Sequence, residues 1–442
     1  MMKCIRQGGM GRNVAAALAA LGLAFSAPAV LAQVKEVKVG LIAPLSGPWA
    51  RQGELMLKGA QMAIEDINNG GGIKSMQGAK LRLVTADAGD STEKAKNAAQ
   101  RFVASEPDMI GATGAWLSSF TLAVTEVTER AEMPILTLSY SDQITARGFK
   151  YVFQTSPTAG AQSVGAMPAI IELGKVATGQ QLRTIGVIGD NTASPVSFLK
   201  PMREGGLEKL GIKLTVDEIF TPPLSDATSI VQKVRSLRPE AVLFVPTNTP
   251  DSKLILEKMN EMGLGRGRIP MIGNGAPLGT PEMLKVVGKD LMEGMLIILA
   301  NWTQKGQEKL IADFKKRTGE PWMTQDSLCS YGDMWIFKEA LEKAGVADRK
   351  KVADAIRTMD TKTGPANYYP GGRIKFNDDG RRAGAGIMII QWQNGEPVTV
   401  YPTEIALAQI RRDQLTAVVQ LYRALGGGWS MFAEQPQGPT LW

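Results

Sequence analysis

The sequence predicts an α/β protein built from parallel sheets that helices cover on both faces. Two observations carry this prediction. Short apolar runs that alternate like strands are followed repeatedly by longer runs with the spacing of amphipathic helices, and this order is typical of βαβ units. The chain also has 442 residues, well beyond the roughly 250–300 at which a single core stops growing, so two lobes are expected.

The first unit begins at the strand around Val37. Val37, Val39 and Leu41 alternate with polar neighbours and predict this strand. A turn over residues 44–48 leads into a helix with apolar residues at helical spacing, which the glycines at 70–72 end. The sequence therefore opens with strand, loop and helix.

Two more units follow directly. Residues 80–85 alternate and predict a second strand, and residues 108–114 form another short apolar run. Between these strands, Asp90 and Glu93 have the spacing of a capping box. We expect Asp90 to cap a helix that runs to about Ala104.

The same order continues towards the C-terminus. Further strands are predicted at residues 135–139, 184–189, 241–246, 270–273 and 295–300, and helices at 121–130, 206–210 and 252–262. After about Asn301, helices are predicted at 305–318, 328–344 and 349–359, and strands at 373–376, 387–393 and 398–401. Asn394-Gly395 is a hairpin signal, so the last two strands are expected to pair.

The first 32 residues have the pattern of a secretory signal peptide: basic residues, then an apolar run, then small residues at the expected cleavage site. Cleavage would leave a chain that starts near Gln33 without a neighbouring cysteine for a lipid anchor, so we expect a freely diffusing periplasmic protein. Because Cys4 leaves with the leader, Cys329 remains alone, and no internal disulfide is expected.

Composition argues against several classes of function. The formal net charge is +7, and three of the positive charges lie in the leader, so no nucleic-acid partner is expected. The chain has no histidine, which excludes a Ser-His-Asp triad, a Cys-His dyad and histidine-containing zinc centres. Neither Asp87 with Asp90 nor Asp378 with Asp379 brings the other oxygen ligands of a metal loop. We predict a protein that is not an enzyme and holds no cofactor or metal.

From Pro44-Leu45-Ser46-Gly47-Pro48-Trp49 onwards, the chain resembles the leucine/isoleucine/valine-binding protein family, the type I periplasmic binding proteins. The other stretches that carry the resemblance are 59–60, 63–68, 71–73, 87–90, 114–119, 134–136, 151–155, 293–295 and 371–376. The resemblance implies two Rossmann-like lobes with parallel central sheets, a hinge of three crossover segments, and a ligand in the cleft between the lobes.

The same resemblance divides the chain into domains. Residues 33–154 and 301–368 would form lobe 1, and residues 155–300 and 369–404 would form lobe 2, with crossovers near Gln154, Ala300 and Tyr369. Residues 405–442 read as an appended amphipathic tail; residues 420–429 resemble the terminus of TolC-like efflux factors, but a loosely attached helix is the favoured interpretation.

Serines after two strands are the first candidate ligand-binding residues. In the family, a Ser-Ser pair and a small-residue loop hold the ligand carboxylate, and the corresponding residues here are Ser118, Ser119, Ser139, Tyr140 and Ser141. Independently, ligands of parallel sheets bind beyond the carboxyl ends of strands, where both loops lie. The alternative interpretation is that one of the two adjacent serines only caps its helix.

Aromatic and amide side chains form a second set of candidates. Trp116, Tyr140 and Gln52 are expected at the mouth of the cleft, although an aromatic residue here would also fit a structural role under a loop. Asn191, Asn248 and Asn274 also follow strands, but asparagine is equally typical of turns.

One departure from the family concerns the ligand itself. Family members that bind amino acids place an acidic residue against the ligand ammonium, whereas the matching stretch here is Gly273-Asn274-Gly275-Ala276. The expected tyrosines are also missing from residues 192–195 and 247–249. We therefore predict a ligand without an α-amino group, such as an aromatic or aliphatic acid or an amide. The expected partners are the permease and ATPase subunits of an ABC importer, and the protein is expected to be a monomer.

Two other functions compete with this interpretation. The same fold can present a ligand to a membrane sensor, and the sequence does not distinguish this use from transport. Ser91-Thr92-Glu93-Lys94, Ser141-Asp142-Gln143 and Lys362-Thr363-Gly364 approximate the three motifs of penicillin-interacting serine enzymes. A helix cap, a loop and a turn explain these three motifs better.

Overall fold

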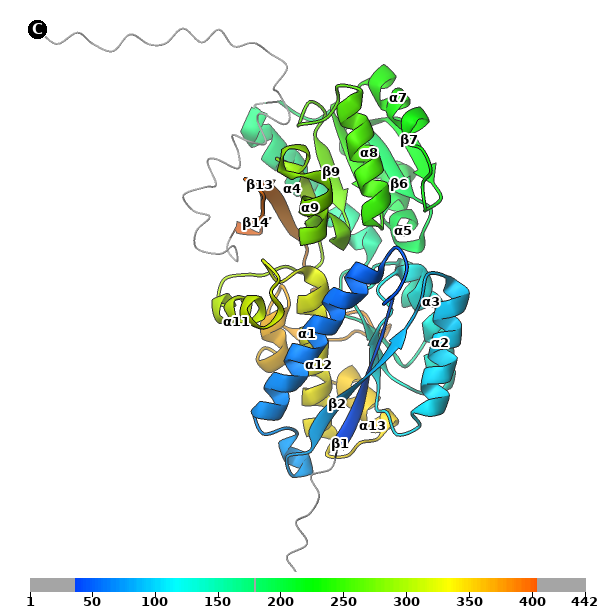
Figure 1. Ribbon diagram of the computed structural model, residues 1–442, viewed down its shortest axis with the longest axis vertical. Coiled ribbons are helices and arrows are strands. Elements are labelled where there is room, and N and C mark those ends of the chain that lie inside the picture. The colour runs from blue at the N-terminus through cyan, green and yellow to red at the C-terminus, as the bar shows by residue number, and fades with distance from the viewer. Residues whose placement is uncertain (1–35, 179, 404–442) are drawn as a thin grey trace, which may run out of the picture.

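The computed structural model describes residues 36–178 and 180–403. These residues form two lobes stacked along the long axis of the molecule, and each lobe has its own sheet (Figure 1). The predicted signal peptide and the predicted tail lie outside the described residues. Within the described ranges, no helix combines the length and the apolar composition that crossing a membrane requires.

The first sheet has five parallel strands in the order β2-β1-β3-β4-β5. Its strands are β1 (Glu36–Ala43), β2 (Lys80–Asp87), β3 (Ala112–Gly114), β4 (Ile135–Thr137) and β5 (Val152–Gln154). Its helices are α1 (Ala50–Asn69), α2 (Thr92–Ser105), α3 (Ser118–Arg130), α11 (Glu308–Thr318), α12 (Gln325–Ala344) and α13 (Arg349–Arg357). The pair α1 and α12 lies on one face of the sheet, and α2 and α3 lie on the other (Figure 1).

A glycine sets how closely α1 and α12 pack. A Cβ atom at Gly59 would lie 2.0 Å from the carbonyl oxygen of Ser327, a distance that no side chain tolerates. At the same place the Ser327 hydroxyl donates to the carbonyl of Leu55 at 2.8 Å. This close approach brings the start of α12, which is distant in sequence, to the cleft end of the first lobe.

The second sheet has seven strands in the order β14-β13-β10-β9-β8-β6-β7. Its strands are β6 (Thr184–Asp190), β7 (Lys213–Phe220), β8 (Ala241–Val245), β9 (Met271–Asn274), β10 (Leu296–Leu299), β13 (Met388–Gln393) and β14 (Glu396–Tyr401). The first five of these strands are parallel, while β13 runs antiparallel to β10 and to β14. The predicted hairpin is thus confirmed, and it makes this second sheet mixed.

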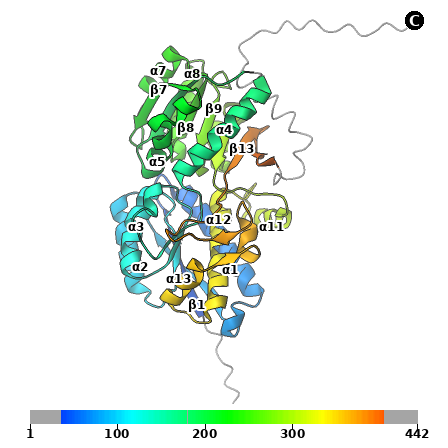
Figure 2. The same cartoon turned by 180° about the vertical axis from the view of Figure 1, so that it is seen from behind.

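Two separate cores cover the faces of the second sheet. The helices α4 (Ala159–Thr178) and α5 (Ala193–Pro201) contribute Met167 and Phe198 to one core. On the opposite face, α7 (Thr228–Leu237), α8 (Thr249–Glu261) and α9 (Pro281–Val287) contribute Val231, Ile255 and Met283 to the other. Seen from behind, α4 crosses the lobe beside β13 (Figure 2).

The remaining elements are short. They are η1 (Lys74–Met76), η2 (Asp142–Ile144), η3 (Met202–Gly206), α6 (Leu207–Lys209), η4 (Ala276–Gly279), α10 (Lys289–Met292), β11 (Asp360–Thr361), η5 (Gly364–Tyr368) and β12 (Ile374–Lys375). Ile374 and Phe376 still pack in the core around the first sheet, and the chain reaches the second sheet at β13. The exact lobe boundaries stay a prediction.

The structure corrects one prediction about helix capping. The N-cap of α2 is Ser91, whose hydroxyl accepts the backbone N–H of Lys94 at 3.2 Å. Asp90, predicted as the cap, instead forms an ion pair with the Lys94 side chain at 2.8 Å. Of these two neighbouring residues, only Ser91 has a side-chain oxygen that accepts a free N–H group of the first helical turn.

Candidate functional site

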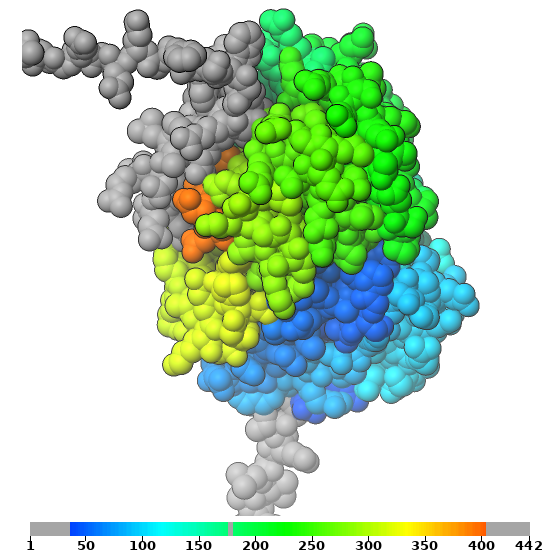
Figure 3. All heavy atoms as spheres, turned by 45° about the horizontal axis from the view of Figure 1, so that its top comes forward, coloured from blue at the N-terminus to red at the C-terminus, as the bar shows by residue number. Residues whose placement is uncertain are grey.

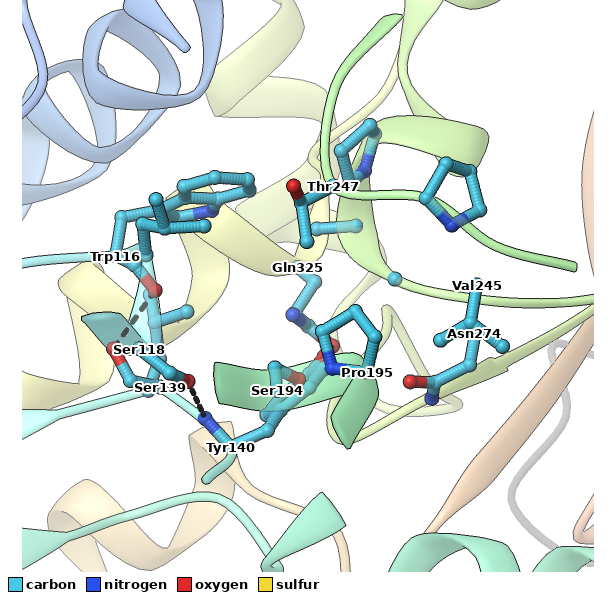
Figure 4. Close-up of a pocket in the computed structure, with 16 residues that line it drawn as sticks. Trp116, Ser118, Ser139, Tyr140, Ser194, Pro195, Val245, Thr247, Asn274 and Gln325 are labelled. Carbon is cyan, nitrogen blue, oxygen red and sulfur yellow. Dashed lines mark hydrogen bonds between the residues drawn. The ribbon is translucent and has the colours of Figure 1, made fainter. Parts of the chain in front are cut away.

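A pocket that is partly open to solvent lies between the two lobes at the carboxyl ends of the strands, and its empty space, open solvent included, is about 410 Å³. The first lobe supplies Trp116, Leu117, Ser118, Leu138, Ser139, Tyr140 and Gln325, and the second supplies Ser194, Pro195, Val245, Pro246, Thr247, Asn274, Gly275, Ala276 and Pro277. None of these 16 side chains is charged (Figure 4). On the face shown in Figure 3, the second lobe (green) lies directly against the first (blue).

Ser118 organises the serine-containing loop of the first lobe. It is the first residue of α3, and its hydroxyl oxygen accepts the N–H of Tyr140 at 3.1 Å (Figure 4). The same oxygen accepts the N–H of Ser141, also at 3.1 Å. A hydroxyl oxygen has two lone pairs and one hydrogen. Both lone pairs are therefore occupied, and the hydroxyl hydrogen is left to donate to an acceptor. The N-cap of α3 is Leu117, so neither adjacent serine caps the helix through its side chain.

Ser139 and Trp116 form the wall beside this loop. The Ser139 hydroxyl donates to the carbonyl of Trp116 at 2.8 Å, and it lies 2.7 Å from the hydroxyl of Thr121 (Figure 4). The Trp116 backbone has a φ of +64°, an uncommon value for a bulky residue that tends to occur at functional sites. Its indole Nε1 donates to the buried carboxylate of Asp326 at 2.9 Å. These bonds fix the tryptophan ring against the pocket.

Tyr140 and Gln325 meet at the base of the pocket. The Tyr140 hydroxyl donates to Gln325 Oε1 at 2.6 Å. Burial raises the pKa of the Tyr140 phenol well above its usual range, so Tyr140 is a neutral donor. The same Oε1 accepts the N–H groups of Ala300 at 2.9 Å and Asn301 at 3.3 Å, where the chain leaves the second lobe.

The second-lobe wall is organised by Asp190, which does not line the pocket. Each carboxylate oxygen of Asp190 accepts an N–H and a hydroxyl, one from Thr192 (2.9 and 2.6 Å) and the other from Thr247 (2.7 and 2.6 Å). Burial raises the pKa of this carboxyl above its usual range, although the two threonines oppose the shift. With four hydrogen bonds, Asp190 has no free oxygen for a ligand cation. Asn274 donates to Gln162 Oε1 at 2.9 Å.

Two predicted residues join the lobes instead of lining the pocket. The Ser119 hydroxyl accepts the N–H of Ala193 at the start of α5, at 3.2 Å. The Ser141 and Ser197 hydroxyls lie 3.0 Å apart, and Ser197 also accepts the N–H of Asp142 at 3.3 Å. These residues hold the α3 side of the first lobe against α5.

The remaining predicted residues lie elsewhere. Gln52 is buried in the first turn of α1 and does not line the pocket. Asn191 is exposed and donates to the hydroxyl of Thr221 at 2.7 Å. Asn248 is the N-cap of α8, and its side-chain oxygen accepts the N–H of Asp251 at 2.8 Å. Of the residues predicted to bind the ligand, five line the pocket: Trp116, Ser118, Ser139, Tyr140 and Asn274. Gln325, Ser194 and Thr247 also line it but were not among the predicted ligand-binding residues.

The residues of the penicillin-enzyme motifs have structural roles in the described chain. The Ser91 hydroxyl caps α2, and Lys94 is paired with Asp90, which raises the pKa of this lysine. A charged, paired lysine does not take a proton from a serine. Ser141 is fully buried between the lobes. The described residues also contain no cluster of three or more carboxylate or cysteine side chains that could hold a metal ion.

Comparisons with known proteins agree with this architecture. The sequence profile of the family described as periplasmic binding protein matches residues 36–397. The Leu/Ile/Val-binding protein homolog 7 of Brucella suis is 30% identical over 412 residues, which covers 91% of this chain and 99% of the relative.

Two solved structures show the same fold. The leucine-binding protein LivK from Thermotoga maritima superposes with a TM-score of 0.70 at 20% identity, covering 84% of this chain and 99% of that protein. A solute-binding protein of an ABC transporter from R. palustris, solved in complex with benzoate, also gives 0.70, at 17% identity, and covers 83% and 95% of the two chains.

Proposed function

Because this chain belongs to the family of periplasmic binding proteins, we propose that it is the solute-binding component of an ABC importer of the branched-chain amino acid type. Membership of this family supports a location in the periplasm. The permease and the ATPase subunits of the importer are its proposed partners, and the two lobes close around the solute by hinge motion. We propose that the exported protein acts as a monomer.

The uncharged lining of the pocket supports a small solute that carries a carboxylate or an amide but no ammonium group. The hydroxyl hydrogen of Ser118 is available to donate, and it lies at the start of α3, where the helix dipole favours negative charge. A buried ammonium group is best balanced by a carboxylate, yet the lining contains none, and Asp190 is fully hydrogen-bonded. The absence of a carboxylate for an ammonium is the observation that carries this proposal.

The apolar part of the wall supports a hydrophobic body for the solute. Trp116, Leu117 and Leu138 of the first lobe face Pro195 and Val245 of the second lobe across the pocket. Aromatic and aliphatic walls of this kind are typical of small-molecule sites. The fold is shared by a leucine-binding protein and by a protein solved with benzoate, so it accommodates solutes with an aliphatic or an aromatic body.

The test compares ligands that differ in one group. Isothermal titration calorimetry of the protein without its leader would use L-leucine, 4-methylpentanoate (leucine without its amino group) and benzoate. We expect at least one of the two simple acids to bind more tightly than leucine, because their binding leaves no ammonium desolvated without a partner. Leucine binding ten times more tightly than both acids would contradict the proposed ligand class.

A further inference from the structure

The side chain of Gln325 has an unusual set of contacts. Gln325 is the first residue of α12, is only 1% exposed and lines the pocket between the lobes. It lies three residues before the point where helical spacing predicts the helix to begin, so no sequence pattern marks it as a site residue.

The hydrogen bonds of Gln325 fix the orientation of its amide. Its Oε1 receives three donors, the Tyr140 hydroxyl and the N–H groups of Ala300 and Asn301. Only an oxygen accepts from such donors, so the amide cannot be turned by 180°. The nitrogen must therefore point the other way, and Figure 4 shows it on the side of the pocket bounded by Trp116 and Ser118.

The Nε2 atom of Gln325 is buried, and it has no hydrogen-bond partner among the described residues. An amide nitrogen carries two hydrogens to donate, and buried donors in folded proteins are nearly always paired. A donor without a protein partner in the wall of a pocket is the pattern expected where a ligand supplies the acceptor.

We propose that Gln325 determines ligand specificity: its Nε2 donates a hydrogen bond to an oxygen of the solute, while its Oε1 holds the crossover segment at Ala300 and Asn301. This inference rests on the proposed function and adds to it that the solute presents an oxygen acceptor at the base of the pocket. The residue thereby connects the bound solute to the segment that links the two lobes.

The closing experiment separates the donor role of Gln325 from its acceptor role. In Gln325→Glu, a carboxylate oxygen still accepts from Tyr140, Ala300 and Asn301, but the donor to the ligand is replaced by an acceptor. Calorimetry would use two pairs of probes, benzoate with benzamide and 4-methylpentanoate with 4-methylpentanamide. We expect the affinity of Gln325→Glu for the acids to fall about 10- to 100-fold. The amides should lose much less, because their N–H groups can donate to the new carboxylate.

The change in the ratio of amide to acid affinity in Gln325→Glu is interpreted beside the uncharged variant Gln325→Met, because a new negative charge alone would also repel an acid. Methionine removes the donor without adding a charge, so a loss of affinity in Gln325→Met assigns the effect to the missing hydrogen bond. An unchanged ratio in Gln325→Glu would overturn the inference. If this variant does not fold, Gln325→Met, which keeps neither role, provides a second test: a Kd for the acids within twofold of wild type would also overturn the inference.

Gln391→Glu provides the matched control. Gln391 is another buried glutamine, in β13 of the second sheet, and its Nε2 donates to the carbonyl of Gly294. The same substitution there should leave the ratio of amide to acid affinity unchanged.

The two proposals can fail separately. If the wild-type protein binds leucine far more tightly than any acid or amide probe, the proposed ligand class fails. An unchanged leucine affinity in Gln325→Glu would then refute the role of Gln325 as well. A wild-type protein that binds none of these ligands would contradict both proposals.

Discussion

At the scale of single residues, the buried carboxyl group of Asp326 makes the stability of the protein depend on pH. Asp326 lies behind Trp116 and is fully buried, and burial raises its pKa to about 7, although the hydrogen bond from Trp116 and the charge of Arg51 oppose the shift. Because this pKa is higher in the folded than in the unfolded protein, the group stabilises the fold below its ordinary range near pH 4. That stability is lost as the pH rises through about 7.

We predict that Asp326→Asn is more stable than the wild type at pH 8, by up to roughly 4 kcal/mol, and differs little near pH 4. The asparagine oxygen can still accept from Trp116, and no buried charge forms. Urea unfolding at several pH values measures the difference. Asp378→Asn, the same change at an exposed position, is the control. The pH dependence should not vanish entirely, because burial also raises the pKa of Asp333 to about 6. Equal stability of Asp326→Asn and wild type at pH 8 would contradict the prediction.

The site could be predicted only in part at this scale. Serine and aromatic residues directly after strands lie where ligands of parallel sheets bind, so Ser118, Ser139 and Trp116 can be predicted from the sequence alone. Gln325 could not, because what brings it to the pocket is the packing of α12 on α1, and no local pattern encodes that contact. Asn248 has the same local context as Asn274, and only the structure separates the helix cap from the pocket residue.

At the scale of elements, the start of α2 depends on one hydroxyl group. Ser91 accepts the N–H of Lys94 and satisfies one of the free donors of the first turn. We predict that Ser91→Ala lowers the free energy of unfolding by about 1 kcal/mol without changing ligand affinity. Ser91→Asp, which keeps a capping oxygen, should stay close to the wild type. Denaturant titration with parallel calorimetry makes the comparison, and weaker ligand binding by the alanine variant would show that α2 shapes the pocket.

The elements that the sequence predicts well are those with a clear period. The strand around Val39 and the final hairpin have undisturbed alternation or a strong turn signal, and both are present in the structure. In contrast, the sequence pattern does not mark α4 as a helix, because Gly165, Pro168 and Gly174 interrupt its helical spacing. Packing against the second sheet keeps it helical despite these residues.

At the scale of the whole molecule, Trp322 bridges the lobes on the side away from the serines. It lies in the loop before α12, and its indole Nε1 donates to the carbonyl of Gly279 in the second lobe at 3.0 Å. Its ring packs edge-on against Trp392, with centroids 5.8 Å apart and an interplanar angle of 75°. Ser119 and Ser141 join the lobes on the α5 side.

We predict that Trp322→Ala shifts the free protein towards a more open arrangement. The radius of gyration measured by small-angle scattering without ligand should increase. The affinity for the solute should fall roughly tenfold, because part of the binding energy is then used to close the lobes. Trp322→Phe keeps the ring and should lie between the alanine variant and the wild type. An unchanged radius together with unchanged affinity would show that Trp322 does not contribute to closure.

Cys329, in α12, is the only cysteine of the described residues and is buried in the first-lobe core. Burial also raises the pKa of its thiol, so the reactive thiolate is scarcely populated. Cys329 is therefore protected against oxidative cross-linking between copies. For the same reason, a cysteine engineered on the surface of either lobe would be the only thiol in this part of the chain within reach of a maleimide dye. The native protein is therefore already a suitable scaffold for a site-specifically labelled fluorescent sensor of its own solute.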